Sequence, residues 1–179
     1  RVAREEAMTH LQQVRRFARQ VLFDYDPLFR DLPGALPMRE RLLKDASAYL
    51  DGLRPTERWP AEWRLEVAQA HANLGEILGQ SQHYRELGRP EDAARHLQEA
   101  ERWAKPLCLT ETPTPGACAV LFDAGLRQAQ SDFSQGRTAE GEARMAALRQ
   151  HLAQHGGQAK ADTLMQLSEL QFSSASQKP

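Results

Sequence analysis

Apolar residues recur three or four positions apart along most of the chain, and prolines and glycines interrupt this pattern at intervals. Such a period places the apolar side chains on one face of an α-helix, where they can pack against neighbouring helices. Short connections between helices favour antiparallel neighbours. The pattern predicts about seven helices, over residues 2–26, 37–53, 60–87, 90–108, 117–135, 139–155 and 159–172, followed by a disordered tail over residues 173–179.

The composition agrees with an all-α fold. Leu, Ala, Glu, Gln and Arg are abundant among the 179 residues, and β-branched residues are few, as is typical of helical proteins. The length is sufficient for one well-buried core, and no long linker divides the chain. Residues 1–172 are therefore predicted to form a single helical domain.

Prolines and glycines also mark the predicted helix ends. Pro90 takes a favourable first-turn position in the helix 90–108, where acidic residues follow it. Gly136 is expected to end the helix 117–135 in the left-handed conformation, and Thr138 to cap the next helix. Residues 110–116 contain two prolines and no periodicity, so they are predicted to be a loop.

Residues 63–106 have the spacing of a tetratricopeptide repeat, a motif of about 34 residues that folds as two antiparallel helices. Small residues at Gly75 and Ala93 would let these helices approach closely. The spacing from Gly75 to Gly88 is about six residues longer than in the consensus motif, so either the first helix or its turn is extended. The resemblance rests on Leu74, Gly75, Gly88, Ala93, Leu97, Ala100 and Pro106.

Residues 126–152 resemble the same motif more weakly. Phe133 and Met145 stand about where Leu78 and Leu97 stand in the first repeat, but Gly141 occupies a position where Ala is usual. One helix pair cannot bury its apolar faces without neighbours. The two repeats therefore predict a short tetratricopeptide-like α-solenoid of antiparallel helices.

The net charge and the hydropathy of the sequence argue against two kinds of partner, nucleic acids and membranes. The formal net charge is −1, and basic and acidic residues are interleaved, so binding to nucleic acid or to a membrane surface is disfavoured. No apolar run approaches the roughly 18 residues of a membrane span. The chain begins at Arg1 without a Met, and we expect it to be a fragment, attached to a membrane only through a segment upstream.

Motifs of catalysis are missing from the sequence. It contains no Gly-rich phosphate loop, nucleophile elbow or kinase catalytic loop. His151 and His155 are one helical turn apart, but no third ligand completes a metal site. His71, His83 and His96 are interpreted as structural or surface residues. We therefore expect no enzymatic activity, no cofactor and no metal.

Cys108 and Cys118 lie on either side of the predicted loop 110–116. A disulfide between them is sterically reachable if their Cβ atoms come to about 4 Å. Two buried thiols that pack as small apolar residues are the alternative. The choice depends on the compartment in which the protein folds, so the sequence leaves both states open.

A ligand surface is hypothesised on the predicted helix 60–87. Gln69, Asn73 and Glu76 lie off its apolar stripe, where they could contact a protein or peptide ligand. Solvated polar residues explain the same positions. Aromatic residues near this helix could line a groove or belong to the core; they are Trp59, Trp63, Tyr84 and Trp103.

Residues 14–53, followed by the extended repeat, resemble a known family. The shared features are Leu32-Pro33-Gly34, Arg39, Tyr49-Leu50 and Leu74-Gly75, in this order. They are similar to the region after the catalytic domain in bacterial eukaryotic-type (Hanks-type) serine/threonine protein kinases with tetratricopeptide-like C-terminal halves. The resemblance implies a periplasmic sensor region, preceded by one membrane span.

Two functions are consistent with these features. The first is a non-catalytic sensor domain of a membrane-anchored Ser/Thr kinase, which binds a peptide, protein or envelope component and changes its conformation or self-association. The second is a soluble cytoplasmic tetratricopeptide scaffold that holds partner proteins together. A helical hydrolase or metalloenzyme would need clustered acids and histidines that the sequence lacks.

Overall fold

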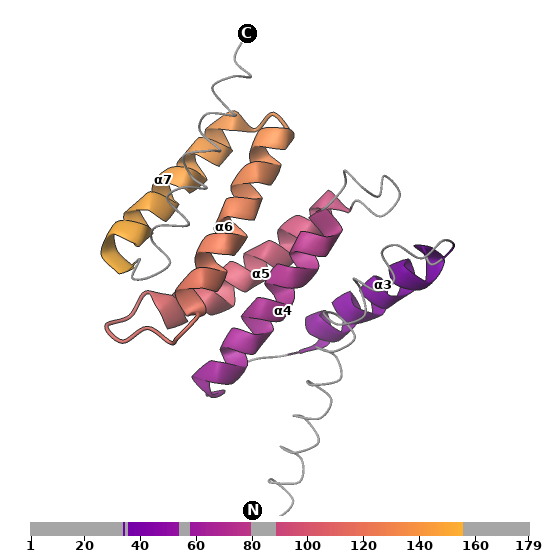
Figure 1. Ribbon diagram of the computed structural model, residues 1–179, viewed down its shortest axis with the longest axis horizontal. Coiled ribbons are helices and arrows are strands. Elements are labelled where there is room, and N and C mark those ends of the chain that lie inside the picture. Colours follow the sequence, from indigo (N-terminus) through magenta and orange to yellow (C-terminus); the bar gives the residue numbers. More distant parts are fainter. Residues whose placement is uncertain (1–33, 35, 54–57, 80–88, 156–179) are drawn as a thin grey trace, which may run out of the picture. The chain divides into compact units, whose positions relative to one another are not determined.

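The computed structural model describes residues 34, 36–53, 58–79 and 89–155. Within these ranges the chain forms α-helices and no strand, which confirms the all-α prediction (Figure 1). The predicted helices 2–26 and 159–172, the tail 173–179 and the segment 80–88 lie outside the described residues. The five helices are α3 (Leu36–Gly52), α4 (Ala61–Gly79), α5 (Pro90–Cys108), α6 (Ala117–Ser134) and α7 (Thr138–His155).

The chain divides into two compact units, residues 1–54 and residues 55–179. The first contains α3 and the second contains α4 to α7. Grouping all helices into one domain over residues 1–172 stays a prediction.

One face of α3 is buried around Leu43 and Leu50, which are seven residues apart. Met38, in the first turn of α3, does not share this face and is 63% exposed. Met38 lies five residues before Leu43, and five residues of α-helix rotate by about 140° beyond one full turn. Met38 therefore points well away from Leu43.

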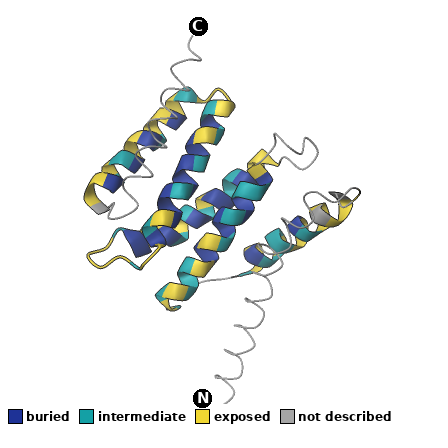
Figure 2. Cartoon of the chain, in the orientation of Figure 1, coloured by how far each residue is buried: buried dark blue, intermediate teal, exposed yellow. Residues whose placement is uncertain are grey.

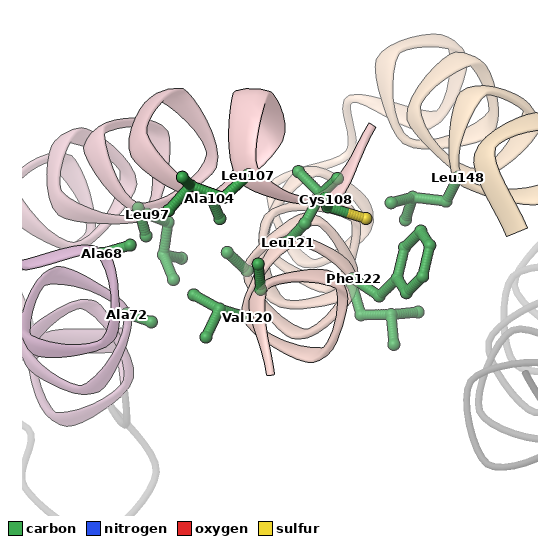
Figure 3. Packing of buried hydrophobic residues seen from close by; sticks show 14 of the residues in the cluster. Ala68, Ala72, Leu97, Ala104, Leu107, Cys108, Val120, Leu121, Phe122 and Leu148 are labelled. Atoms are coloured by element: carbon green, nitrogen blue, oxygen red, sulfur yellow. The ribbon is translucent and has the colours of Figure 1, made fainter. Parts of the chain in front are cut away.

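In the second unit, successive helices pack against one another, and α4 also contacts α6. Figure 2 shows buried residues along the sides on which these helices meet. The resulting core draws on all four helices (Figure 3). Its labelled members include Ala68 and Ala72 of α4, Leu97, Ala104 and Leu107 of α5, Val120, Leu121 and Phe122 of α6, and Leu148 of α7.

Glycines allow close approach within both helix pairs of this unit. A Cβ atom at Gly75 of α4 would lie 2.7 Å from Cγ of Leu97 and 3.1 Å from the carbonyl oxygen of Ala93. At Gly141 of α7, a Cβ atom would lie 2.7 Å from the Phe133 ring. The ring occupies the space that an alanine methyl would need, which explains glycine at this position.

The turn between α6 and α7 contains the predicted left-handed glycine. Gly136 has φ +75°, as predicted, and the N–H groups of Gly136 and Arg137 donate to the carbonyls of Phe133 and Asp132 at 3.0 and 2.8 Å. This pair of bonds is a Schellman motif.

The prediction that Thr138 caps α7 was wrong. The N–H of Gly141 donates to the carbonyl of Arg137 at 3.1 Å, so Arg137 holds the N-cap position and Thr138 is the first helical residue. The Schellman motif reverses the chain in so few residues that α7 begins directly after Arg137.

Replacing Gly75 with Ala is expected to lower the free energy of unfolding by about 1–3 kcal/mol, because the added methyl overlaps Leu97 and the Ala93 carbonyl. Gly79→Ala on the same helix is the matched control. Its Cβ would meet only the Ala93 Cβ at 3.7 Å, an ordinary contact, so its stability should be unchanged or higher. Urea denaturation of both variants measures the difference, and equal stabilities would contradict the close approach.

Candidate functional site

The predicted ligand residues lie along one side of α4. The Gln69 side-chain amide donates a 2.9 Å hydrogen bond to Oδ1 of Asn73, one helical turn later. Gln69 is exposed, while Asn73 and Glu76 are half-buried. Both amide side chains offer N–H donors and a C=O acceptor, which match the hydrogen-bonding groups of a peptide backbone.

The polar residues of α4 continue onto α6. Arg127 of α6 forms an ion pair with Glu76 at 3.1 Å, and its Nε donates to Asp123 at 2.9 Å. The guanidinium is held by two carboxylates, so its charge is balanced and it is poorly suited to capture an additional anion. We call the residues Gln69, Asn73, Glu76, Asp123 and Arg127 the α4–α6 polar face.

Sequence reasoning missed the contribution of α6 to this face. Asp123 and Arg127 are four residues apart with opposite charges, a spacing that supports an ion pair on a helix. That signal was present in the sequence. The partnership of Arg127 with Glu76 depends on the packing of α4 against α6, which no local spacing reveals.

A buried pair of imidazoles joins α4 to α5. His71 is 3% exposed and His96 is fully buried. Their Nδ1 atoms are 2.9 Å apart, and the ring centroids are 5.1 Å apart. A guanidinium nitrogen of Arg95 lies 3.2 Å from Nε2 of His96. The sequence showed two separate histidines, 25 positions apart, and it is the helix hairpin that brings them together.

A second polar cluster joins α6 to α7 around Asp132. The Asp132 carboxylate, only 7% exposed, contacts Arg137 at 2.6 Å and Arg144 at 3.2 Å. Arg144 also approaches Glu101 of α5 at 3.8 Å. This Asp132 cluster therefore links three successive helices through charge-assisted contacts.

Burial raises the pKa of Glu101 above its ordinary value, because desolvation disfavours the carboxylate. The positive charge of Arg144 opposes this shift, and Gln128 and Lys105 oppose it less. Desolvation is the largest influence, so the ion pair only partly offsets the cost of burying the acid.

Cys108 and Cys118 form a disulfide in the structure, with Cα atoms 4.7 Å apart. Cys108 is fully buried at the end of α5, and Cys118 lies in the first turn of α6. The N–H of Thr114 donates to the Leu107 carbonyl at 2.9 Å, which also ties the loop to α5. The crosslink holds two consecutive helices together at this loop.

Two tryptophans pack together at the start of α4. Trp59 and Trp63 meet edge to face, with ring centroids 6.2 Å apart. Trp103 is half-buried and packs against the core. Tyr84 lies outside the described residues. Trp103 thus belongs to the packing of the fold.

Within the described ranges, no group of three or more His, Cys, Asp and Glu residues is placed to hold a metal ion. His151 is half-buried on α7. Across the same ranges, none of the helices is both long enough and apolar enough to cross a membrane.

Comparison with known proteins does not assign the chain to a family. No protein-family model, no curated protein and no solved structure matches it.

The disulfide predicts the outcome of alkylation and of reduction. Non-reduced protein, unfolded and treated with an alkylating agent, should gain no alkyl group by mass spectrometry. Reduction should lower the free energy of unfolding by about 2–3 kcal/mol, because a loop of about ten residues is released. A Cys108→Ala/Cys118→Ala variant should not respond to reductant. Two alkylated thiols in the non-reduced protein would contradict the crosslink.

The raised pKa of Glu101 predicts a pH dependence with a definite sign. The folded state holds the proton more strongly than the unfolded chain, so this group contributes stability at low pH that is lost as pH rises through its folded pKa. Relative to Glu101→Gln, the wild type should therefore lose stability as pH increases from about 4.5 to 7. Urea denaturation across this range measures the difference.

Glu111→Gln is the control for the removal of one acidic residue, because Glu111 is exposed in the loop between α5 and α6. If the stability of the wild type relative to that of Glu101→Gln stays constant or increases as pH rises, desolvation is not the main influence on Glu101.

Proposed function

We propose that this chain is a non-catalytic protein-interaction domain that binds an extended peptide or protein segment on the α4–α6 polar face. The observation that carries the proposal is the row of polar side chains on α4, which Arg127 continues onto α6. Amide side chains at adjacent turns of one helix can pair with successive backbone groups of an extended ligand.

The architecture proposed for this surface is a short tetratricopeptide-like solenoid. Two helix pairs, α4–α5 and α6–α7, follow one another, and the first helix of one pair contacts the first helix of the next. Close approach at Gly75 and Gly141 supports the equivalence of the two pairs. Stacked pairs of this kind present their first helices along a shared surface, and here that surface includes the α4–α6 polar face.

The ion pair between Glu76 and Arg127 gives this surface a means of signalling. It joins the two helices that would contact the ligand. A ligand that binds better to one relative placement of α4 and α6 shifts the population toward that placement. Binding is thereby converted into a change in how the two helix pairs stack.

We further propose that the domain is the periplasmic sensor of a membrane-anchored bacterial Ser/Thr kinase. This part rests on the resemblance over residues 14–53 and on the extended repeat around Leu74-Gly75. The disulfide between Cys108 and Cys118 favours an oxidising compartment. A kinase domain and an apolar span encoded upstream of Arg1 would support this assignment, whereas their absence would favour the cytoplasmic scaffold.

Selection from a random peptide library displayed on phage tests the binding surface. Peptides enriched on the 179-residue chain should bind the Gln69→Ala/Asn73→Ala variant about tenfold more weakly, because two hydrogen-bonding side chains are lost. Titration calorimetry measures both affinities.

Gln98→Ala, an exposed amide on α5, is the matched control and should retain full affinity. Failure to enrich any peptide would contradict the proposed function. Peptides that bind the double variant as tightly as the wild type would show that the ligand surface lies elsewhere.

A further inference from the structure

The contact between His71 and His96 is a hydrogen bond whose proton can be assigned. Their Nδ1 atoms are 2.9 Å apart and buried, so one nitrogen must carry a hydrogen and the other must offer a lone pair. Two lone pairs, or two N–H groups, would repel each other at this distance. At least one of the two imidazoles is therefore neutral.

Arg95 decides which nitrogen carries the proton. A guanidinium group can only donate hydrogen bonds, and that of Arg95 lies 3.2 Å from Nε2 of His96. Nε2 of His96 is therefore the acceptor, and the proton of this ring is on Nδ1. It follows that His96 donates to Nδ1 of His71, which leaves the proton of His71 on Nε2.

Neither ring can take up a further proton without losing a contact. A proton on Nε2 of His96 would point at the Arg95 guanidinium and repel it. A proton on Nδ1 of His71 would face the N–H of His96, unless that ring moved its own proton to Nε2 and so lost Arg95. Each route breaks a hydrogen bond and adds a positive charge to a buried site.

Several charged side chains near the two imidazoles form ion pairs with one another. On α5, the Asp92 carboxylate lies between Arg89 at 2.7 Å and Arg95 at 3.7 Å. The other charged residues of the two helices that carry these histidines are Glu62, Arg64, Glu66 and Glu76 on α4, and Glu91, Glu99, Glu101, Arg102 and Lys105 on α5. Among them, Glu76 pairs with Arg127 of α6, and Glu99 pairs with Arg102.

We propose that the His71–His96 pair is a pH-sensitive latch that stabilises the packing of α4 against α5 while both imidazoles are neutral and weakens this packing on acidification. This inference goes beyond the proposed function, since it concerns the stability of the helix pair and not a ligand. Where the proposed function also holds, acidification would destabilise the helix that carries Gln69 and Asn73.

The sign of the effect follows from proton linkage. A histidine in an unfolded chain takes up a proton near pH 6.5, whereas the closed latch resists it. The unfolded state then binds more protons below this pH, so stability falls as pH falls. Between pH 7.5 and 5.5, each imidazole that stays neutral in the folded state should lower the folding equilibrium constant about tenfold.

Denaturation of the full 179-residue chain at pH 7.5 and 5.5 tests the latch. The folding constant of the wild type should fall at least tenfold more than that of a His71→Leu/His96→Leu variant, in which apolar side chains replace both partners. His151→Gln, which removes a histidine from α7, should respond like the wild type. The same pH response in the wild type and the double variant would overturn the proposal.

A second measurement on the wild type covers the case in which the double variant does not fold. Long-range ¹H–¹⁵N NMR spectra of the imidazoles should place the proton on Nε2 of His71 and on Nδ1 of His96. They should also show both rings neutral until the chain unfolds. Protonation of both rings near pH 6.5 with the fold intact would overturn the proposal.

Discussion

The close packing of α4 against α5 is the constraint on which the second unit of the chain depends. At Gly75 the two helix backbones come so near that a single methyl group would overlap Leu97 and the Ala93 carbonyl. Only at this separation can the short side chains Ala68 and Ala72 reach the core shared with α6. The same separation brings the imidazoles of His71 and His96 into hydrogen-bond contact.

Polar groups join the helices in two different ways. Between α4 and α5, two imidazoles share one hydrogen bond beside an arginine. Between α6 and α7, a carboxylate is neutralised by two arginines. A buried polar group is tolerated only when its partners are in place, so both clusters select one arrangement of their helices. They differ in the groups they use, because an arginine stays charged across the physiological pH range whereas a histidine can change its charge there.

The surface proposed for ligand binding depends on the packing of α4 against α6. Gln69 and Asn73 are placed by α4 alone, since they are one helical turn apart. Glu76 gains its partner only because α6 lies beside α4. A ligand on this face would therefore contact two helix pairs at once, and its binding energy would act on their relative placement. The disulfide between Cys108 and Cys118 fixes the end of α5 to the start of α6.

Features that depend on residues a few positions apart could be predicted from the sequence alone. Apolar periodicity located the helices of the described ranges, Pro90 marked the start of α5, and Gly136 marked the left-handed turn after α6. Each of these follows from backbone geometry within one or two turns. The cap of α7 was missed by one residue, because the hydrogen bonds of the preceding turn decided where the helix begins.

Contacts between residues far apart in the sequence depend on how the helices pack. His71 and His96 are 25 positions apart, and Glu76 and Arg127 are farther apart still. Helical spacing shows which face a side chain occupies, but not which helix covers that face or at what height. The packing of the apolar faces against one another determines which helix covers a given face. Gly75 and Gly141 allow these faces to approach closely.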